Sequence, residues 1–311
     1  MRGLVTKSTG SQYTVRTEIG PLLCYIKGNL RLKGIRTTNP VAVGDWVEVA
    51  QQPDGTNWIK AIEPRRNYII RRATNLSKEA QVLAANLDQV LLLVTLHHPD
   101  TNLVFIDRFL ATAEAYRVPV VIVFNKIDLL TEKDMEVAYQ LRTMYEALRY
   151  LTLLVSAKNP ASLTDLRELL KGKTTLLAGN SGVGKSTLLN SLFGKIVTRT
   201  GLISDAHDKG MHTTTFSEMY DLPFEGEQGA ANIIDIPGIK GFGSVEMDKY
   251  EVSHYFREIF TIGQGCRYSD CLHMGEPGCA VHDAVVDGRI TISRYESYIS
   301  ILGDCSESKY R

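Results

Sequence analysis

The fold is decided by the stretch Gly179-Asn180-Ser181-Gly182-Val183-Gly184-Lys185-Ser186. A β-like run, residues 174–178, comes before it, and a run with helical spacing, residues 186–193, comes after it. A strand, a glycine-rich turn with Gly-Lys-Ser, and a helix together form the context of a phosphate-binding P-loop. The alternative is a glycine-rich turn that matches by chance, and the flanking strand and helix argue against it. The stretch therefore predicts that the chain binds a nucleoside triphosphate.

Each part of the stretch has an expected role. The glycines allow backbone N–H groups to surround the β-phosphate, and the positive end of the helix dipole favours negative charge there. Lys185 is expected to reach the β- and γ-phosphates, and the Ser186 hydroxyl to bind Mg²⁺. The predicted nucleotide-binding residues here are Gly179, Asn180, Ser181, Gly182, Val183, Gly184, Lys185, Ser186 and Thr187.

Length and composition are those of a globular protein with several domains. A chain of 311 residues predicts two or three domains, and 44% hydrophobic with 23% charged residues is typical of soluble proteins. No apolar run approaches the roughly twenty residues that span a bilayer. The first residues also lack the apolar segment of a signal peptide. We therefore expect a cytoplasmic protein without a membrane contact.

The central part of the chain alternates strands with amphipathic helices. Continuous apolar runs at residues 89–96 and 118–124 are typical of strands that are covered on both faces. Helices are expected near residues 103–113, 131–148 and 162–170, with a third strand at 151–155 and the P-loop strand at 174–178. Thr131 and Asp134 resemble a capping box at the start of the second helix. This alternation predicts a parallel α/β sheet.

Polar residues follow two of these strands and predict guanine recognition. The carboxylate of Asp128 can accept hydrogen bonds from N1–H and the 2-amino group of guanine, and adenine offers neither, so the nucleotide is expected to be GTP. Asn125 is expected at the other edge of the base and the Lys126 stem along its face. A backbone N–H after the third strand can reach guanine O6. The predicted base-binding residues are Asn125, Lys126, Ile127, Asp128, Ser156, Ala157 and Lys158.

The remaining elements of a GTPase follow the P-loop. Residues 231–238 read as a strand that ends in Asp-x-x-Gly, so Asp235 is expected to hold Mg²⁺ and the Gly238 N–H to contact the γ-phosphate. A threonine of residues 213–215 can complete the Mg²⁺ site, with Thr214 favoured over Thr213. Ile239 stands where many GTPases carry a water-orienting glutamine. His212 is the nearest residue for that role, and a loop histidine that bonds to backbone is the equally weighted alternative.

The order of these motifs is unusual. In an ordinary small GTPase the P-loop comes first and Asn-Lys-x-Asp comes late, whereas here residues 125–128 precede residues 179–186. The sequence therefore predicts a circularly permuted G domain, which a sheet tolerates because pairing depends on neighbouring strands. The segment after Asp235 then runs directly into the C-terminal part, with residues 241–244 as a hinge.

The N-terminal part is basic and rich in short strands. Residues 1–72 contain 12 Lys and Arg against 5 Asp and Glu, a charge of +7 in a chain of net charge +0. Strands expected at residues 13–16, 22–26, 47–49 and 58–62 predict a small barrel or sandwich, and size and charge favour an OB-fold that binds RNA. A flexible linker is expected at residues 71–75. Candidate phosphate contacts are Arg31, Lys33, Arg36, Arg65, Arg66, Arg71 and Arg72.

Four residues near the C-terminus have the composition of a metal site. Cys266, Cys271, His273 and Cys279 supply three thiolates and an imidazole, which suit tetrahedral Zn²⁺ and leave no open position for catalysis. Unrelated free cysteines are the alternative. Helical spacing from Val281 to Tyr298 predicts a small helical domain around a structural zinc ion.

With these motifs, the chain resembles the ribosome small-subunit-dependent GTPase A family (RsgA, also called YjeQ) over essentially its whole length. The resemblance implies three domains: an OB-fold β-barrel over residues 1–72, a circularly permuted α/β P-loop GTPase domain over 73–241 and a zinc-binding helical domain over 242–311. It implies GTP hydrolysis that the small (30S) ribosomal subunit stimulates, contacts with 16S rRNA and a role late in subunit maturation. It also implies a part for His212 in hydrolysis and, as an expectation, a monomer.

Two other function classes fit some of these features. An RNA-binding translational regulator would use GTP only as a conformational ligand, and the absence of subunit-stimulated turnover would favour it. A metal-handling GTPase would need a zinc site that exchanges readily, which four filled positions disfavour.

Overall fold

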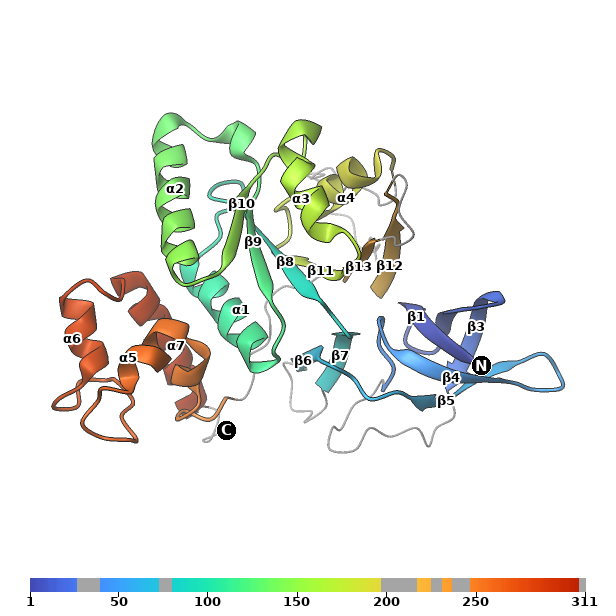
Figure 1. The fold of residues 1–311 in the computed structure, drawn as a ribbon, viewed down its shortest axis with the longest axis horizontal. Helices are drawn as coiled ribbons and strands as arrows, with labels where there is room; N and C mark the ends of the chain where they lie inside the picture. Colours follow the sequence, from blue (N-terminus) through green and yellow to red (C-terminus); the bar gives the residue numbers. More distant parts are fainter. Residues whose placement is uncertain (27–39, 73–79, 197–216, 225–230, 237–246, 308–311) are drawn as a thin grey trace, which may run out of the picture.

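A computed structural model describes residues 1–26, 40–72, 80–196, 217–224, 231–236 and 247–307 (Figure 1). Three parts follow one another along the molecule: a small barrel with the N-terminus, a central α/β layer and a C-terminal group of helices. The residues that belong to the predicted hydrolysis loop, 200–215, lie outside the described ranges. So do Gly238 and the predicted hinge at 241–244.

The N-terminal part is a five-stranded barrel. Its strands are β1 (Arg2–Ser8), β2 (Tyr13–Thr17), β3 (Gly20–Ile26), β4 (Trp46–Gln51) and β5 (Asn57–Ile62). They pair in the order β1-β2-β3-β5-β4, and an additional β1–β4 pairing closes the barrel. Alternate residues such as Val5, Val15 and Ile59 fill the interior because successive side chains of a strand point to opposite faces. The predicted OB-type barrel is confirmed.

A hairpin joins the barrel to the centre. Strands β6 (Tyr68–Arg72) and β7 (Ala80–Ala85) pair antiparallel, with Arg71 opposite Gln81 and Arg72 opposite Ala80. The expected linker at residues 71–75 is therefore wrong for its first two residues. Ile69, which is fully buried, anchors the hairpin in the central core, so this segment belongs to the packed structure.

The central part is a sheet covered on both faces. Its strand order is β10-β9-β8-β11-β13-β12, with β8 (Gln89–Val94), β9 (Val120–Phe124), β10 (Leu151–Leu154), β11 (Thr174–Gly179), β12 (Ser217–Leu222) and β13 (Ala231–Asp235). All neighbours are parallel except β12 and β13. One face packs on α1 (Leu103–Ala115) and α2 (Glu132–Ala147), the other on α3 (Thr164–Leu170) and α4 (Lys185–Phe193) (Figure 1). The predicted α/β layer and the Thr131–Asp134 capping box are confirmed.

Strand β12 is an element that the sequence analysis did not predict. It joins β13 on one side and β1 of the barrel on the other, through the pairs Lys7–Glu218 and Ser8–Ser217. The barrel and the central sheet consequently form one continuous sheet of 11 strands. Lys7 and Glu218 add an ion pair with an N–O distance of 3.1 Å.

The C-terminal helices pack on α1. They are α5 (Arg257–Gly263), α6 (Ala280–Val286) and α7 (Ile292–Glu307). The helical spacing expected from Val281 to Tyr298 is thus divided between two helices, because Gly288 adopts a left-handed φ of 73° between them. Arg294 of α7 is buried between Asp107 of α1 and Glu258 of α5, with N–O distances of 2.6 and 2.7 Å. Among the residues described, no helix is long and apolar enough to cross a bilayer.

Candidate functional site

The P-loop turn follows β11 and leads into α4, as the sequence predicts. Gly179 and Gly184 have positive φ angles of 142° and 101°. A Cβ atom on Gly179 would lie 2.4 Å from the Leu93 carbonyl oxygen, and one on Gly184 would lie 2.4 Å from Nδ2 of Asn125. Both positions therefore require glycine for backbone conformation and for space. The second brings the turn directly against the Asn-Lys-x-Asp motif.

Asn125 connects three of the predicted motifs. Its side chain is buried, and its Nδ2 donates a hydrogen bond to the Val183 carbonyl at 2.8 Å. Its Oδ1 accepts one from the Ala157 N–H at 3.0 Å. A single amide thus joins the strand ends of β9 and β10 to the P-loop. The motifs lie far apart in the sequence and form one site in the fold.

The carboxylate that the sequence predicts to read the base, that of Asp128, is held by residues that follow β10. Asp128 lies in a 3₁₀ turn, Ile127–Leu129, and its Oδ1 accepts a hydrogen bond of 2.5 Å from the Ser156 hydroxyl. The Ser156 hydroxyl oxygen in turn accepts a bond from the Lys158 N–H at 3.3 Å. The residues after β10 therefore fix one oxygen of Asp128.

Lys185 and Asp235 bring opposite charges to neighbouring strand ends. Lys185 donates from Nζ to the carbonyls of Gly179 and Asn180, both at 2.7 Å. Burial lowers the pKa of Lys185, and the Asp235 carboxylate opposes this shift. Burial likewise raises the pKa of Asp235, against the effect of Lys185. Both groups have lost solvation through burial, and a bound phosphate and cation would replace it.

Several predicted residues lie outside the part of the chain that the structure describes. These are His212, Thr213, Thr214, Thr215, Gly238 and Ile239. Ser186 and Thr187 lie in the first turn of α4, and Asn180, Ser181 and Gly182 lie in the turn before it. Their roles stay predictions.

The predicted phosphate contacts of the barrel are only partly described. Arg65 is not a surface charge: its side chain is 6% exposed and bonds to the buried carboxylate of Asp45 at 2.6 Å. Arg66 pairs with Asp88 at 2.8 Å. Both basic residues therefore have structural partners. Arg31, Lys33 and Arg36 lie outside the described ranges, and the side chains of Arg71 and Arg72 are not described.

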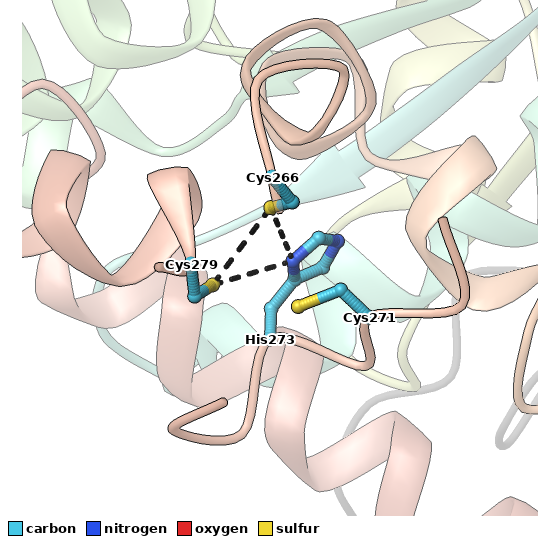
Figure 2. A group of neighbouring side chains, drawn as sticks. All are labelled: Cys266, Cys271, His273 and Cys279. Atoms are coloured by element: carbon cyan, nitrogen blue, oxygen red, sulfur yellow. Dashed lines mark hydrogen bonds between the residues drawn. The ribbon is translucent and has the colours of Figure 1, made fainter. Parts of the chain in front are cut away.

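A second site lies in the C-terminal helices. Figure 2 shows Cys266, Cys271, His273 and Cys279 converging, with one ligand atom from each within 4.8 Å of the others. The Cys266 and Cys279 sulfurs both lie 3.5 Å from Nδ1 of His273. Burial raises the pKa of Cys271 to about 12, so a thiolate there needs a cation beside it. Three sulfurs and a nitrogen at this spacing fit a tetrahedral metal ion.

The backbone around this cluster is held by residues that the sequence analysis missed. The hydroxyl of Tyr295 donates to the His273 carbonyl at 2.6 Å, and that of Tyr298 donates to the Leu272 carbonyl at 2.8 Å. Glu276 accepts bonds from the N–H groups of Leu272 and Met274. The two tyrosines are three residues apart on α7, which places them on one helix face. They orient the ligand loop.

Another missed segment is the loop after β8. The Lys126 ammonium donates to the His98 carbonyl, and Pro99 Cδ lies 3.4 Å from where Gly182 would carry a Cβ. The loop therefore contacts both the P-loop and the Asn-Lys-x-Asp motif. No local pattern in the sequence marks it.

Comparison with known proteins gives a consistent result. Family models described as the RsgA GTPase and the RsgA N-terminal domain match residues 62–245 and 2–59. Proteins named "Small ribosomal subunit biogenesis GTPase RsgA" are 54% identical in Phocaeicola vulgatus and 58% identical in Porphyromonas gingivalis, each covering 100% of this chain and 99% of the relative.

Two solved structures share the architecture. YjeQ from Thermotoga maritima is 34% identical with a TM-score of 0.73, and 98% of each chain is covered. YloQ, described as a circularly permuted GTPase, is 26% identical with a TM-score of 0.71, covering 100% of this chain and 96% of that one. The chain therefore belongs to the RsgA GTPase family and is a GTP-hydrolysing enzyme with a circularly permuted GTPase domain.

Proposed function

We propose that this GTPase acts on the small ribosomal subunit late in its maturation, and that it binds GTP between the P-loop and the Asn-Lys-x-Asp motif. The main structural support for this site is the pair of hydrogen bonds that Asn125 makes with Val183 and Ala157. These bonds bring phosphate-binding and base-binding residues together although the chain presents them in permuted order. The names of the relatives support the small ribosomal subunit as the partner.

Guanine is selected by Asp128. One of its oxygens bonds to Ser156, which orients the carboxylate toward the N1–H and 2-amino groups of guanine. An adenine base would leave this acid without a partner, which costs binding free energy. Lys126 lies along the base. One backbone N–H of residues 156–158 would exchange its bond within the protein for a bond to guanine O6.

The phosphates lie in the turn formed by residues 179–187. Lys185 exchanges its bonds to the Gly179 and Asn180 carbonyls for phosphate oxygens, which restores the solvation that burial removed. Ser186, Asp235 and Thr214 would hold Mg²⁺, which would supply positive charge that stabilises the phosphates during hydrolysis. Gly238 donates its N–H to the γ-phosphate.

Hydrolysis needs an oriented water, and Ile239 cannot orient one. We assign that role to His212, whose imidazole can hold the attacking water near neutral pH. Slow turnover of the free protein and stimulation by the subunit follow, because the chain lacks the glutamine that orients water in many GTPases. Loss of the γ-phosphate moves the segment after Gly238, which runs into the C-terminal helices.

The proposed domains comprise about residues 1–72, 73–241 and 242–311, and each has its own role. Residues 1–72, which include the barrel, carry a charge of +7 and dock on 16S rRNA, since phosphates dominate the affinity for nucleic acid. The Cys266, Cys271, His273 and Cys279 site holds one structural Zn²⁺ that stabilises the C-terminal helices. We expect a cytoplasmic monomer that has no membrane contact.

The direct test is steady-state GTP turnover with and without purified small ribosomal subunits, with large subunits as the control. Strong stimulation by small subunits, lost in His212→Ala and kept in His254→Ala, would support both the partner and the histidine. Stimulation that survives His212→Ala removes His212 from hydrolysis. Turnover that no subunit changes contradicts the ribosomal role and favours a nucleotide-dependent RNA regulator.

A further inference from the structure

The loop after β8 is built as a compact unit. The Thr95 hydroxyl donates to the Pro99 carbonyl at 2.6 Å, and the N–H groups of Thr95 and Thr101 bond across the loop at 3.1 and 3.0 Å. Thr95 is buried, so these bonds are protected from water. The position of the loop is therefore well determined at its base.

The tip of this loop contacts the base-reading motif. The His98 carbonyl accepts a hydrogen bond from the Lys126 ammonium. Lys126 itself has a left-handed backbone with φ of 64°, and its Cε lies 4.0 Å from where Gly184 would carry a Cβ. The Lys126 stem thus extends beside the P-loop and ends on the loop. Whatever holds His98 in place also fixes the direction of Lys126.

His97 ties the loop to the helix that follows the motif. Its Nδ1 lies 3.2 Å from Asp100 Oδ1, and its Nε2 lies 3.0 Å from Asp134 Oδ1. Asp134 is the third residue of α2 and also caps it through Thr131. The His97 contacts therefore join the two segments that flank residues 125–128: the loop that receives Lys126 and the first turn of α2.

The contacts require a charged ring. A neutral imidazole has one N–H donor, whereas carboxylates at both nitrogens require two, so the geometry selects imidazolium. Hydrogen bonds to Asp134 and then Asp100 raise the pKa of His97, and the bond from His97 is the largest cause that lowers the pKa of Asp134 to about 2. Among the residues described, the His98 ring also faces His97, at 6.3 Å between ring centroids.

We propose that His97 is a positioning residue for guanine recognition: its imidazolium, between Asp100 and Asp134, holds the His98 carbonyl where it fixes Lys126 along the base. This inference rests on the proposed base-binding role of residues 125–128. It adds His97, which precedes residues 125–128 in the sequence, to the base site, and it makes the affinity for guanine depend on the protonation of His97. The phosphate half of the site has no contact with His97 in the part of the chain described.

The dependence on pH has a definite sign. Because the folded protein raises the pKa of His97, the bridging contribution is complete below the ordinary histidine pKa and is lost as pH rises through the raised value. The His97 side chain is 45% exposed, so solvent screens the pairs and the expected change is about two- to fivefold in Kd. Guanine nucleotide should therefore bind more weakly at pH 8.5 than at pH 6.

The test is the Kd of the full chain for a fluorescent GDP analogue, measured from pH 6 to 8.5 for four proteins. We expect His97→Ala to weaken binding about two- to fivefold at pH 6 and to flatten the profile. Arginine can donate to both carboxylates at every pH, so His97→Arg should restore the affinity and also give a flat profile. His254→Ala, which changes an exposed histidine of the C-terminal part, should behave as the wild type.

A second readout separates positioning from loss of folded protein. In GTP turnover His97→Ala should raise KM with kcat unchanged, whereas partial unfolding lowers the active fraction and leaves KM alone. Guanine-selective binding that is identical in wild type and His97→Ala overturns the positioning role and leaves the proposed function intact. Equal affinity of the wild type for GDP and ADP analogues contradicts the proposed base site itself, and the His97 role with it.

Discussion

Asn125 donates from its side-chain amide to the Val183 carbonyl at 2.8 Å, although the chain places the two residues 58 positions apart and in permuted order. The same amide accepts a bond from the Ala157 N–H. Parallel strands end at one edge of the sheet, so the loops after β9, β10 and β11 meet there regardless of where the chain is cut. The permutation changes the connections between strands and preserves this meeting point.

Replacement of Gly184 should disturb the P-loop and the base-reading motif together. A Cβ there would lie 2.4 Å from Asn125 Nδ2, and the φ angle of 101° is unfavourable for alanine. Gly184→Ala should weaken guanine nucleotide binding at least about tenfold, because the buried amide of Asn125 must give up a partner. Titration with a fluorescent GDP analogue measures the effect.

Gly194→Ala is the matched control. Gly194 also has a left-handed φ, of 65°, and a Cβ added there would meet no atom within 4 Å. This variant should lose about 1–2 kcal/mol of stability and keep its nucleotide affinity. If both variants bind equally well, the contact between Gly184 and Asn125 has no role in the site.

Arg294 should be a major determinant of the contact between the C-terminal helices and α1. Its side chain is 2% exposed and pairs with Asp107 and Glu258, whose side chains are 1% and 8% exposed. Arg294→Met should cost about 3–5 kcal/mol, since two buried carboxylates lose their counter-charge. Urea unfolding followed by circular dichroism measures the loss of stability, and amide hydrogen exchange of α7 shows where it occurs.

The surface pair of Arg108 with Asp304 provides the comparison. Its side chains are 26% and 47% exposed, so Arg108→Ala should cost less than about 1 kcal/mol. Equal costs for the two arginine variants would mean that burial does not determine the strength of this contact.

Removal of the metal should destabilise the C-terminal helices and leave nucleotide binding unchanged. Cys279 is buried within the cluster, whereas Cys305 is half-buried on α7 and is not one of its four members. Cys279→Ser should lose the metal ion proposed for this cluster and amide protection in α6 and α7, because that ion would hold the ligand loop. Cys305→Ser should keep the metal ion and the amide protection. Metal analysis and hydrogen exchange measure these two effects. Equal metal content in both variants would contradict the assignment of Cys279 as a metal ligand.

Local patterns account for the elements that are buried or capped within one segment. Strands β8 and β9 are covered on both faces and are therefore continuous apolar runs. The helix start at Thr131 was predictable because its capping bonds join residues three positions apart. The four metal ligands lie within 14 residues of one another, so their spacing is visible in the sequence.

Contacts between distant segments could not be predicted in this way. Strand β12 contains two acidic residues and is stabilised by pairing with β1, which includes an ion pair between Lys7 and Glu218, 211 positions apart. Arg65 reads as a surface charge until its partner Asp45 is known. The role of His97 likewise depends on Asp134, which lies 37 positions away on another element. Tertiary structure determines these partners.

Guanine recognition is tested by the subunit-stimulated turnover of Asp128→Asn, measured with GTP and with xanthosine triphosphate. The NH₂ group of an asparagine side chain can donate to the 2-oxygen of xanthine. It cannot accept a hydrogen bond from the 2-amino group of guanine. The kcat/KM for GTP should fall at least about 100-fold, and the variant should hydrolyse xanthosine triphosphate under stimulation by small ribosomal subunits. The exposed Asp165→Asn serves as the control and should keep GTP turnover. Unchanged GTP turnover by Asp128→Asn, with no use of xanthosine triphosphate, would mean that the permuted motifs do not form one guanine-reading site.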